Sequence, residues 1–385
     1  MPSISGVDPV TGTRTLPNAK EWLQAHLDQQ RHPLNAIDTD LAQSTIDGLT
    51  SLEPEPWARA WLGPAEKLAN EAERLEAQGD RSAGRWAWWQ CYQFAFLGRY
   101  PSPLHPAKLA AYDYARSAFM RATAHDDPPV ERVEVPFAGQ SGEGDTVSFY
   151  VARAGGSPTG AAVLMWGGVD AWKEESYLRG RLLRERGIAT VHVDMPGVGE
   201  APVLAGPDAE RMFTPVFDWL DGSDLDRSRI GLLGLSFGGY WAMKLAHTHR
   251  TRVRAAVNWG GGIHLTFQPS WQERSRTAGS YLMDLMAARA RIFGGDTFDD
   301  YIAHCPELSL LDQGVLDQPS SPLLLVNGKD DQQNASADIY LALEHGDPKT
   351  ARMFPGGHMG DGPVLPTVSD WLEQQLAAPA AQEAR

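Results

Sequence analysis

Short apolar segments alternate with helical ones from about residue 129 onward, and this alternation limits the possible folds most strongly. Such short, continuously apolar runs are typical of strands buried on both faces of a parallel sheet. Parallel strands joined through helices need right-handed crossovers, so the pattern predicts a doubly wound, mostly parallel α/β sheet. The expected strands cover 161–166, 189–193, 229–235, 253–259 and 322–326, with an antiparallel pair over 131–137 and 146–153. The expected helices cover 173–186, 209–220, 238–247 and 336–345.

The region before this alternation has a helical pattern and many aromatic side chains. Helices are expected over 64–78, 83–97 and 106–123, and six of the 13 tryptophans fall in this region. These aromatics either form the core of a small helical domain or line an apolar substrate pocket, and Trp89 is our candidate for a substrate contact.

The two patterns predict two domains. Residues 1–128 are expected to form an N-terminal arm and a helical cap domain, and residues 129–385 the α/β domain. Within the latter, 262–316 lacks a convincing strand and is expected to be a lid-like insertion, with a helix-like run over 279–293. An α/β domain of this size is complete by itself, so the first 128 residues are additional to the sheet.

Charge and cysteine content exclude several classes of protein. The 385 residues carry a net charge of −15, which disfavours binding to a phosphate backbone and hence to nucleic acid. Cys91 and Cys305 lie far apart, which argues against a disulfide framework or a cysteine-based zinc site. No secretory signal or membrane-spanning run is visible, so we expect a soluble cytoplasmic protein. Neither a metal-binding nor a cofactor-binding motif is found, so no metal and no cofactor are expected.

A glycine-flanked serine directly follows one of the predicted strands. Residues 234–238 read GLSFG and match G-x-S-x-G, with a predicted helix after them. Glycines on both sides of Ser236 let the backbone turn sharply, which exposes the hydroxyl near a helix N-terminus that favours negative charge. This context indicates a nucleophile elbow. The alternative is a glycine-rich turn with a capping serine.

A serine nucleophile needs a general base, which follows it in the chain in this arrangement. His345 and His358 are the histidines after the last strongly predicted strand. His345 ends a predicted helix and is better explained as a cation at the helix C-terminus. His358 lies in the glycine-rich turn 355–360, after a short strand over 350–354, and is the predicted base.

The acid that orients the base is expected in the loop after strand 322–326. Asp330 and Asp331 both lie there, and the G-x-x-D spacing from Gly328 favours Asp331. The other aspartate is then a solvated or loop-capping carboxylate.

The remaining predicted site residues follow other strands. The oxyanion hole needs two backbone N–H groups, one from Phe237 and one from Gly168 or Val169, between which the sequence does not choose. Asp170 in the same loop and Trp259 at the end of strand 253–259 are predicted substrate contacts. The alternative is that the segment 258–262, which contains Trp259, is only a flexible connection into the insertion.

Residues 160–378 resemble the α/β-hydrolases. The helical region resembles the N-terminal segment of one branch, which includes the fermentation-respiration switch esterase, dihydroxypseudooxynicotine hydrolase and the fungal polyketide-shortening pigment hydrolases. The segment 194–200 resembles the D-x-P-G-x-G loop of such enzymes, where it shapes the edge of the site, although a structural turn is the alternative. The branch resemblance rests on 79–84 (GDRSAG) with the aromatic run after it, 100–101 (YP), 106–108 (PAK) and 167–175 (GGVDAWKEE).

This resemblance implies a helical cap over the site and a homodimer acting on a small apolar or aromatic molecule. Some members of the branch cleave a carbon–carbon bond next to a ketone, and others are esterases. The first hypothesis is therefore a serine hydrolase of an aromatic or polyketide-like ketone. The second is a carboxylesterase, thioesterase, lactonase or acyltransferase with the same triad. The third is a non-catalytic binding protein with the hydrolase fold, since fold alone does not fix function.

Overall fold

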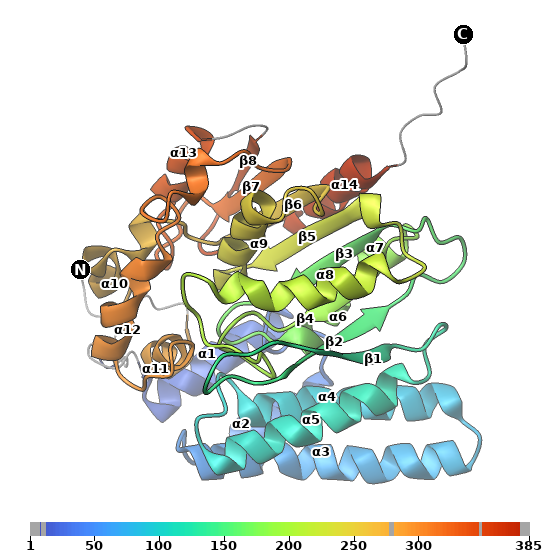
Figure 1. Cartoon of the computed structure of the whole chain (residues 1–385). Helices are drawn as coiled ribbons and strands as arrows, with labels where there is room; N and C mark the ends of the chain where they lie inside the picture. The colour runs from blue at the N-terminus through green and yellow to red at the C-terminus, as the bar shows by residue number, and fades with distance from the viewer. Residues whose placement is uncertain (1–7, 9–12, 277–280, 346–348, 378–385) are drawn as a thin grey trace. The chain divides into compact units, whose positions relative to one another are not determined.

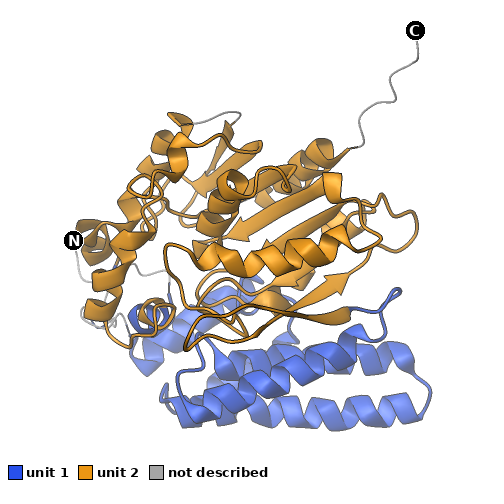
Figure 2. Ribbon diagram, in the orientation of Figure 1, with its two compact units in different colours: residues 1–130, 276–288 blue, residues 131–275, 289–385 orange. Residues whose placement is uncertain are grey.

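The structure is a computed structural model that describes residue 8 and residues 13–276, 281–345 and 349–377. It divides into two compact units, shown in Figure 2. Unit 1 comprises residues 1–130 and 276–288, and unit 2 comprises residues 131–275 and 289–385. The region expected as a lid-like insertion is thus shared between the units, because 276–288 groups with the helical residues. Among the described residues, no helix is both long and apolar enough to cross a membrane.

Unit 1 is built from helices with an aromatic core. Trp57 and Trp61 are fully buried and lie 5.7 Å apart between ring centroids, and Trp61 contacts Phe94 at 6.0 Å. Trp88 and Trp89 are also buried, whereas Trp86 is exposed. Four of the six tryptophans in this region therefore contribute to the core of the helical unit. The helices are α1 (Leu16–Asp28), α2 (Thr39–Gly48), α3 (Pro54–Ala77), α4 (Arg81–Arg99) and α5 (Pro106–Thr123).

The third helix differs from the sequence prediction. The sequence predicts a start at Pro64, but α3 starts at Pro54 and contains Pro64 in its interior. Proline inside a helix lacks an N–H donor and normally disfavours helical structure. Here the burial of Trp57 and Trp61, on the turns before Pro64, offsets that cost. Of the expected N-terminal arm, residues 1–7 and 9–12 lie outside the described part, and helix α1 starts at Leu16.

Unit 2 contains an eight-stranded sheet with the order β1-β2-β4-β3-β5-β6-β7-β8. Strand β2 runs antiparallel to β1 and β4. The remaining strands, β3 to β8, all run parallel to one another. The predicted doubly wound, mostly parallel sheet is confirmed. The strands are β1 (Glu131–Pro136), β2 (Thr146–Ala152), β3 (Ala162–Trp166), β4 (Ala189–Val193), β5 (Ile230–Leu235), β6 (Ala255–Trp259), β7 (Leu323–Gly328) and β8 (Lys349–Phe354).

Helices cover both faces of this sheet (Figure 1). Helices α8 and α9 lie on one face, and α6, α7 and α14 on the other. Side chains of α14 and α7 pack with alternate residues of β3, β5, β6 and β7 in one apolar core. The helices of unit 2 and of the insertion are α6 (Lys173–Arg179), α7 (Arg181–Arg184), α8 (Thr214–Asp221), α9 (Phe237–Thr248), α10 (Pro269–Ser275), α11 (Leu285–Arg291), α12 (Phe298–His304), α13 (Ala337–Leu343) and α14 (Val364–Leu376).

The strand register brings the carboxyl ends of the parallel strands together. Trp166 pairs with Gly234, Leu235 with Trp259, and Trp259 with Val326. The loops after these strands therefore start at one edge of the sheet, which is where α/β proteins place their sites. Of the helix-like run expected over 279–293, the helical part is α11, and 281–284 and 292–293 are not helical. Residues 277–280 lie outside the described residues.

Candidate active site

Ser236 lies in a sharp turn between β5 and α9. Its backbone has φ 55° and ψ −127°, a conformation that residues other than glycine adopt only at a cost in free energy. Its N–H donates to the Trp259 carbonyl at 2.7 Å, which holds the turn in place. The flanking glycines are sterically required. A Cβ at Gly234 would lie 2.1 Å from the Gly238 oxygen, and a Cβ at Gly238 would lie 2.2 Å from the Gly167 oxygen.

Ser236, His358 and Asp331 form a continuous chain of hydrogen bonds. The Ser236 Oγ lies 2.7 Å from the His358 Nε2, and the His358 Nδ1 lies 2.8 Å from the Asp331 Oδ2. A carboxylate only accepts, so Nδ1–H donates to Asp331, and Nε2 of the neutral ring accepts from the Ser236 hydroxyl. The Asp331 side chain is fully buried, whereas 12% of the His358 side chain is exposed. The arrangement can therefore remove a proton from the serine hydroxyl.

The loop after β7 presents its two aspartates differently. Asp331 is buried and contacts His358, whereas Asp330 is exposed. Burial alone would raise the pKa of the Asp331 carboxyl. The nearby His358, the Asn327 amide and the Gln333 N–H outweigh this effect and lower the pKa below its usual value. The Gln333 N–H donates to Asp331 Oδ1 at 2.7 Å, so both carboxylate oxygens are held.

Asp331 should also make the stability of the protein depend on pH. Its folded pKa is lowered, so its stabilising contribution is complete above the unfolded pKa of about 3.9 and is lost as the pH falls through the folded pKa. We therefore expect wild type to be more stable than Asp331→Asn near neutral pH, with a difference that shrinks below about pH 4. Urea unfolding of both proteins across this range measures it. A difference that stays constant into strong acid would contradict this electrostatic account.

Asn327 at the end of β7 connects the Asp331 carboxylate to the loop that carries His358. The sequence interpretation missed this residue. Its Nδ2 donates to Asp331 Oδ2 at 2.8 Å, and its Oδ1 accepts from the Met359 N–H at 3.0 Å. One buried amide thus holds the carboxylate and the backbone beside His358. Trp259 holds the backbone beside His358 as well, since its Nε1 donates to the Met359 carbonyl at 2.7 Å. The only sequence signal for Asn327 is its place at the strand end, one residue before Gly328.

The loop after β3 approaches the serine from the other side. A Cβ built on Gly168 would lie 3.2 Å from Ser236 Oγ and 3.4 Å from the Phe237 nitrogen. Glycine therefore keeps this backbone close to the hydroxyl while leaving room beside it. Val169 next to it is buried, and Asp170 is half-buried. The structure thus brings Gly168 and the Phe237 nitrogen, two of the three predicted oxyanion-hole residues, next to Ser236.

The other predicted positions lie elsewhere. Trp89 packs against Tyr92 at 5.1 Å and Phe119 at 6.5 Å inside unit 1, so its contact with a substrate stays a prediction. His345 lies two residues beyond the end of α13, with Nδ1 3.9 Å from a carboxylate oxygen of Asp317. The histidine that meets Ser236 is therefore His358.

Two further Ser–His pairs occur in unit 2 and serve as comparisons. Ser176 Oγ lies 2.6 Å from His192 Nδ1, but both residues are fully buried, and burial holds the pKa of His192 well below its ordinary value. Ser309 Oγ lies 2.7 Å from His264 Nδ1, the same ring nitrogen that faces Asp312 at 3.8 Å. Within the described part of the chain, neither pair has a carboxylate on the ring nitrogen opposite the serine. In the Ser236–His358 pair, by contrast, Asp331 lies on the ring nitrogen opposite the serine.

Cysteine does not offer an alternative nucleophile here. Cys91 and Cys305 are fully buried, and burial raises the pKa of each thiol to about 12. Thiolate is the reactive form, so both thiols are inert near neutral pH. Among the described residues, no group of three or more His, Cys, Asp or Glu side chains is arranged to hold a metal ion.

The family model described as Esterase FrsA-like matches residues 55–377. The chain belongs to this family. Its FrsA-like relatives include 2,6-dihydropseudooxynicotine hydrolase of Paenarthrobacter nicotinovorans, 29% identical, with 84% of this chain and 85% of the relative covered. Esterase FrsA of Photobacterium profundum is 24% identical, with 93% of this chain and 87% of the relative covered.

Solved structures show the same fold as this FrsA-like chain. The crystal structure of 2,6-dihydroxy-pseudo-oxynicotine hydrolase matches with a TM-score of 0.71 and 25% identity, covering 86% of this chain and 92% of that one. AbyA5 matches with a TM-score of 0.68 at 20% identity, covering 94% and 99%, and shows the fold alone. The chain is an enzyme of the α/β-hydrolase class, which confirms the family, the fold and the enzyme class predicted from the sequence.

Proposed function

We propose that this FrsA-like hydrolase uses Ser236, His358 and Asp331 as a catalytic triad. The observation that carries the proposal is the unbroken hydrogen-bond chain from the Ser236 hydroxyl through the imidazole to the buried carboxylate. Ser236 is the nucleophile and His358 the general base. Asp331 keeps the imidazole in the required tautomer and stabilises the imidazolium once it forms.

The oxyanion would be held by two backbone N–H groups at the same place. Phe237 is the first residue of α9, so its N–H points out of a helix N-terminus that favours negative charge. Gly168 or Val169 would supply the second N–H from the loop after β3. The closeness of Gly168 to Ser236 supports this role, because donors must lie within hydrogen-bond distance of the developing oxyanion.

The proposed reaction is cleavage of a carbon–carbon bond next to a ketone in an aromatic or polyketide-like substrate. Ser236 Oγ adds to the carbonyl carbon while His358 takes its proton. Collapse of the tetrahedral intermediate breaks the carbon–carbon bond, and the imidazolium protonates the leaving carbon. Water, deprotonated by His358, then attacks the acyl-serine. The carboxylic acid leaves, and the imidazolium returns the proton to Ser236 Oγ. Because the leaving group is a carbanion, the substrate must delocalise its charge, as a β-diketone does.

Support for the ketone substrate comes from relatives. One similar protein is named for hydrolysis of 2,6-dihydropseudooxynicotine, and another is 20-hydroxy-prefusarin hydrolase of Gibberella moniliformis, 28% identical over 61% of its length. The family description favours a second candidate, an esterase. An ester passes through the same steps but releases an alkoxide, which leaves more easily. Asp170, Trp259 and Trp89 remain the proposed substrate contacts, and a homodimer remains the proposed assembly.

A substrate profile separates the two reactions. We expect 1-phenyl-1,3-butanedione to be cleaved with a kcat/KM above that for p-nitrophenyl esters of matched acyl length, and neither to be cleaved by Ser236→Ala. Product acids are identified by mass spectrometry. Rapid ester turnover without diketone cleavage would make the protein an esterase and overturn the ketone proposal, while leaving the triad in place.

A further inference from the structure

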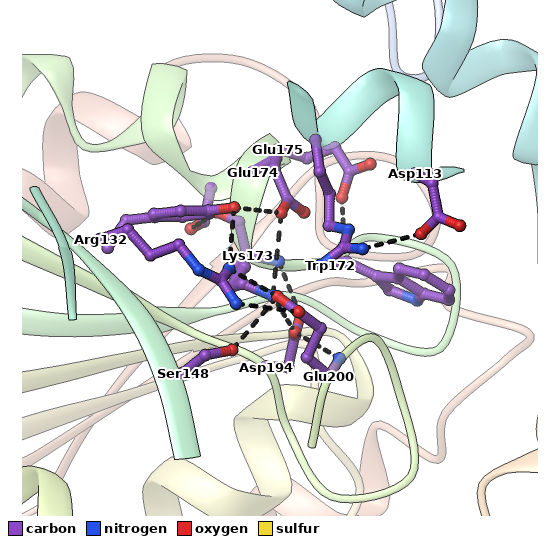
Figure 3. A network of polar contacts seen from close by, with 12 residues as sticks. Asp113, Arg132, Ser148, Trp172, Lys173, Glu174, Glu175, Asp194 and Glu200 are labelled. Carbon is purple, nitrogen blue, oxygen red and sulfur yellow. Dashed lines mark hydrogen bonds and ion pairs between the residues drawn. The ribbon is translucent and has the colours of Figure 1, made fainter. Parts of the chain in front are cut away.

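Lys173 is the first residue of α6 and directly follows the loop 167–172, which contains Gly168. Its side chain is fully buried. The Nζ lies 2.6 Å from Asp194 Oδ2, 2.7 Å from Glu200 Oε2 and 3.8 Å from Glu174 Oε1. Figure 3 shows this ammonium group at the centre of converging carboxylates. A buried cation with these partners is fixed in position, because moving it away would leave buried charges without a partner.

Asp194 connects Lys173 to the loop 194–200, which follows β4. It directly follows β4, and its Oδ1 accepts from the Lys173 backbone N–H at 2.9 Å. Its Oδ2 accepts from the Glu200 N–H at 2.9 Å as well as from Lys173 Nζ. A Cβ on Gly199, whose φ is 56°, would lie 2.2 Å from this carboxylate. The D-x-P-G-x-G segment is therefore a turn wrapped around the Asp194 carboxylate.

Side chains from β1 and β2 complete the cluster. Arg132 binds both oxygens of Glu200, at 2.8 and 3.0 Å, and Ser148 donates to the same carboxylate at 3.2 Å. Tyr150 donates to Glu174 at 3.0 Å. Lys173 and Arg132 thus balance Asp194 and Glu200. Burial raises the pKa of Glu174, which favours its neutral form.

The loop 167–172 lies between two fixed ends. At one end, Trp166 pairs with Gly234 in the sheet. At the other end, the cluster holds both the backbone and the side chain of Lys173. The loop itself is tight, since a Cβ on Gly167 would lie 1.8 Å from the Ala171 oxygen. Where α6 begins therefore determines where Gly168 lies beside Ser236.

We propose that Lys173 is a positioning residue that sets the oxyanion-hole loop, acting through Asp194 and the start of α6. The inference rests on the proposed function of Ser236 and the loop. A misplaced donor weakens binding of the transition state more than binding of the substrate, so the effect should fall on kcat rather than KM. A displacement on the order of 1 Å at such a site costs about a hundredfold in rate.

Lys173→Met tests the proposal, because methionine keeps most of the volume and removes the charge. We expect kcat to fall between about tenfold and a hundredfold, with KM changed by less than about threefold. The affinity for a trifluoromethyl ketone, which forms a tetrahedral oxyanion on serine, should fall by the same factor as kcat/KM. A purely structural ion cluster would lower the melting temperature without moving this affinity.

Lys244→Met is the matched control. Lys244 is also buried in unit 2 and pairs with Glu210 at 2.9 Å, but it contacts neither the loop 167–172 nor Asp194 in the described contacts. We expect a lower melting temperature with kcat and inhibitor affinity retained. If Lys173→Met does not fold, Glu200→Gln is the second variant, since it keeps the backbone bond to Asp194 and removes one charge. It should give a smaller loss in the same two readouts.

Unchanged kcat and inhibitor affinity in folded Lys173→Met, or in Glu200→Gln if the former does not fold, would overturn the proposal. An increase in KM alone would do the same. Ser236→Ala in the same assays separates the two claims. If Ser236→Ala keeps full activity, the proposed function fails. If it is inactive while the Lys173 variant is fully active, this inference fails alone.

Discussion

Ser236→Ala is expected to lower kcat by about 10⁴-fold or more on any substrate that wild type turns over. The variant removes the atom that forms a bond with the substrate carbonyl in the proposed mechanism. Alanine fits the turn no worse than serine, since both have a Cβ at the same φ of 55°. The melting temperature should therefore stay near that of wild type. Steady-state kinetics and thermal unfolding of the same preparations measure the two effects.

Ser309→Ala provides the control for this change. Ser309 likewise pairs with a histidine, His264, at 2.7 Å, although Ser309 is buried and Ser236 is half-buried. Since that imidazole has no carboxylate on its opposite nitrogen among the described contacts, Ser309 should not be activated. Ser309→Ala is expected to keep most of the activity. If Ser309→Ala is inactive while Ser236→Ala is active, the assignment of the nucleophile is wrong.

Asp331→Asn is expected to lower kcat by about 10⁴-fold with the fold intact. Asp331 Oδ1 accepts from the Gln333 and Asn334 N–H groups, and Oδ2 accepts from Asn327 and His358. The backbone donors cannot change, so the NH₂ of an asparagine would face His358. The ring then loses the acceptor that fixes its tautomer and the charge that stabilises the imidazolium. KM should change little, because the carboxylate is buried. Steady-state kinetics measure both constants.

The neighbouring Asp330→Asn is the matched control, with the same chemical change one residue away. Asp330 is exposed, and its backbone N–H donates to the Gly356 carbonyl, a bond that the substitution leaves intact. Activity within about twofold of wild type is expected, as for surface changes generally. The opposite pattern, with Asp330→Asn inactive and Asp331→Asn active, would mean that the proposed acid is the wrong aspartate.

Much of unit 2 could be predicted because its signals are local. Continuous apolar runs mark parallel strands, and the strand order places their carboxyl ends at one edge. The glycines around Ser236 are required by contacts of 2.1 and 2.2 Å, so the motif and the turn have the same physical cause. The chain order of serine, acid and histidine then indicates which loops should meet. The catalytic role of these side chains stays a prediction.

The remaining features depend on contacts between distant residues. Asn327 joins Asp331 to the backbone of Met359, 32 residues later, and no local pattern distinguishes it from other loop asparagines. Lys173 and Glu200 belong to separate motifs that the sequence interpretation did not connect. The predicted start of α3 was wrong because burial of Trp57 and Trp61 outweighs the effect of Pro64. Tertiary packing decides each of these cases.

Covalent labelling with a fluorophosphonate tests the central claim most directly. The reagent bonds to an activated serine and mimics the tetrahedral intermediate, so only a serine with a working base and oxyanion hole reacts rapidly. Wild type should gain one phosphonyl group, located by peptide mass spectrometry on Ser236, and lose activity in parallel. Ser236→Ala should gain none. Wild type that hydrolyses its substrate while Ser236 stays unmodified, or that is modified at Ser309 instead, would contradict the account.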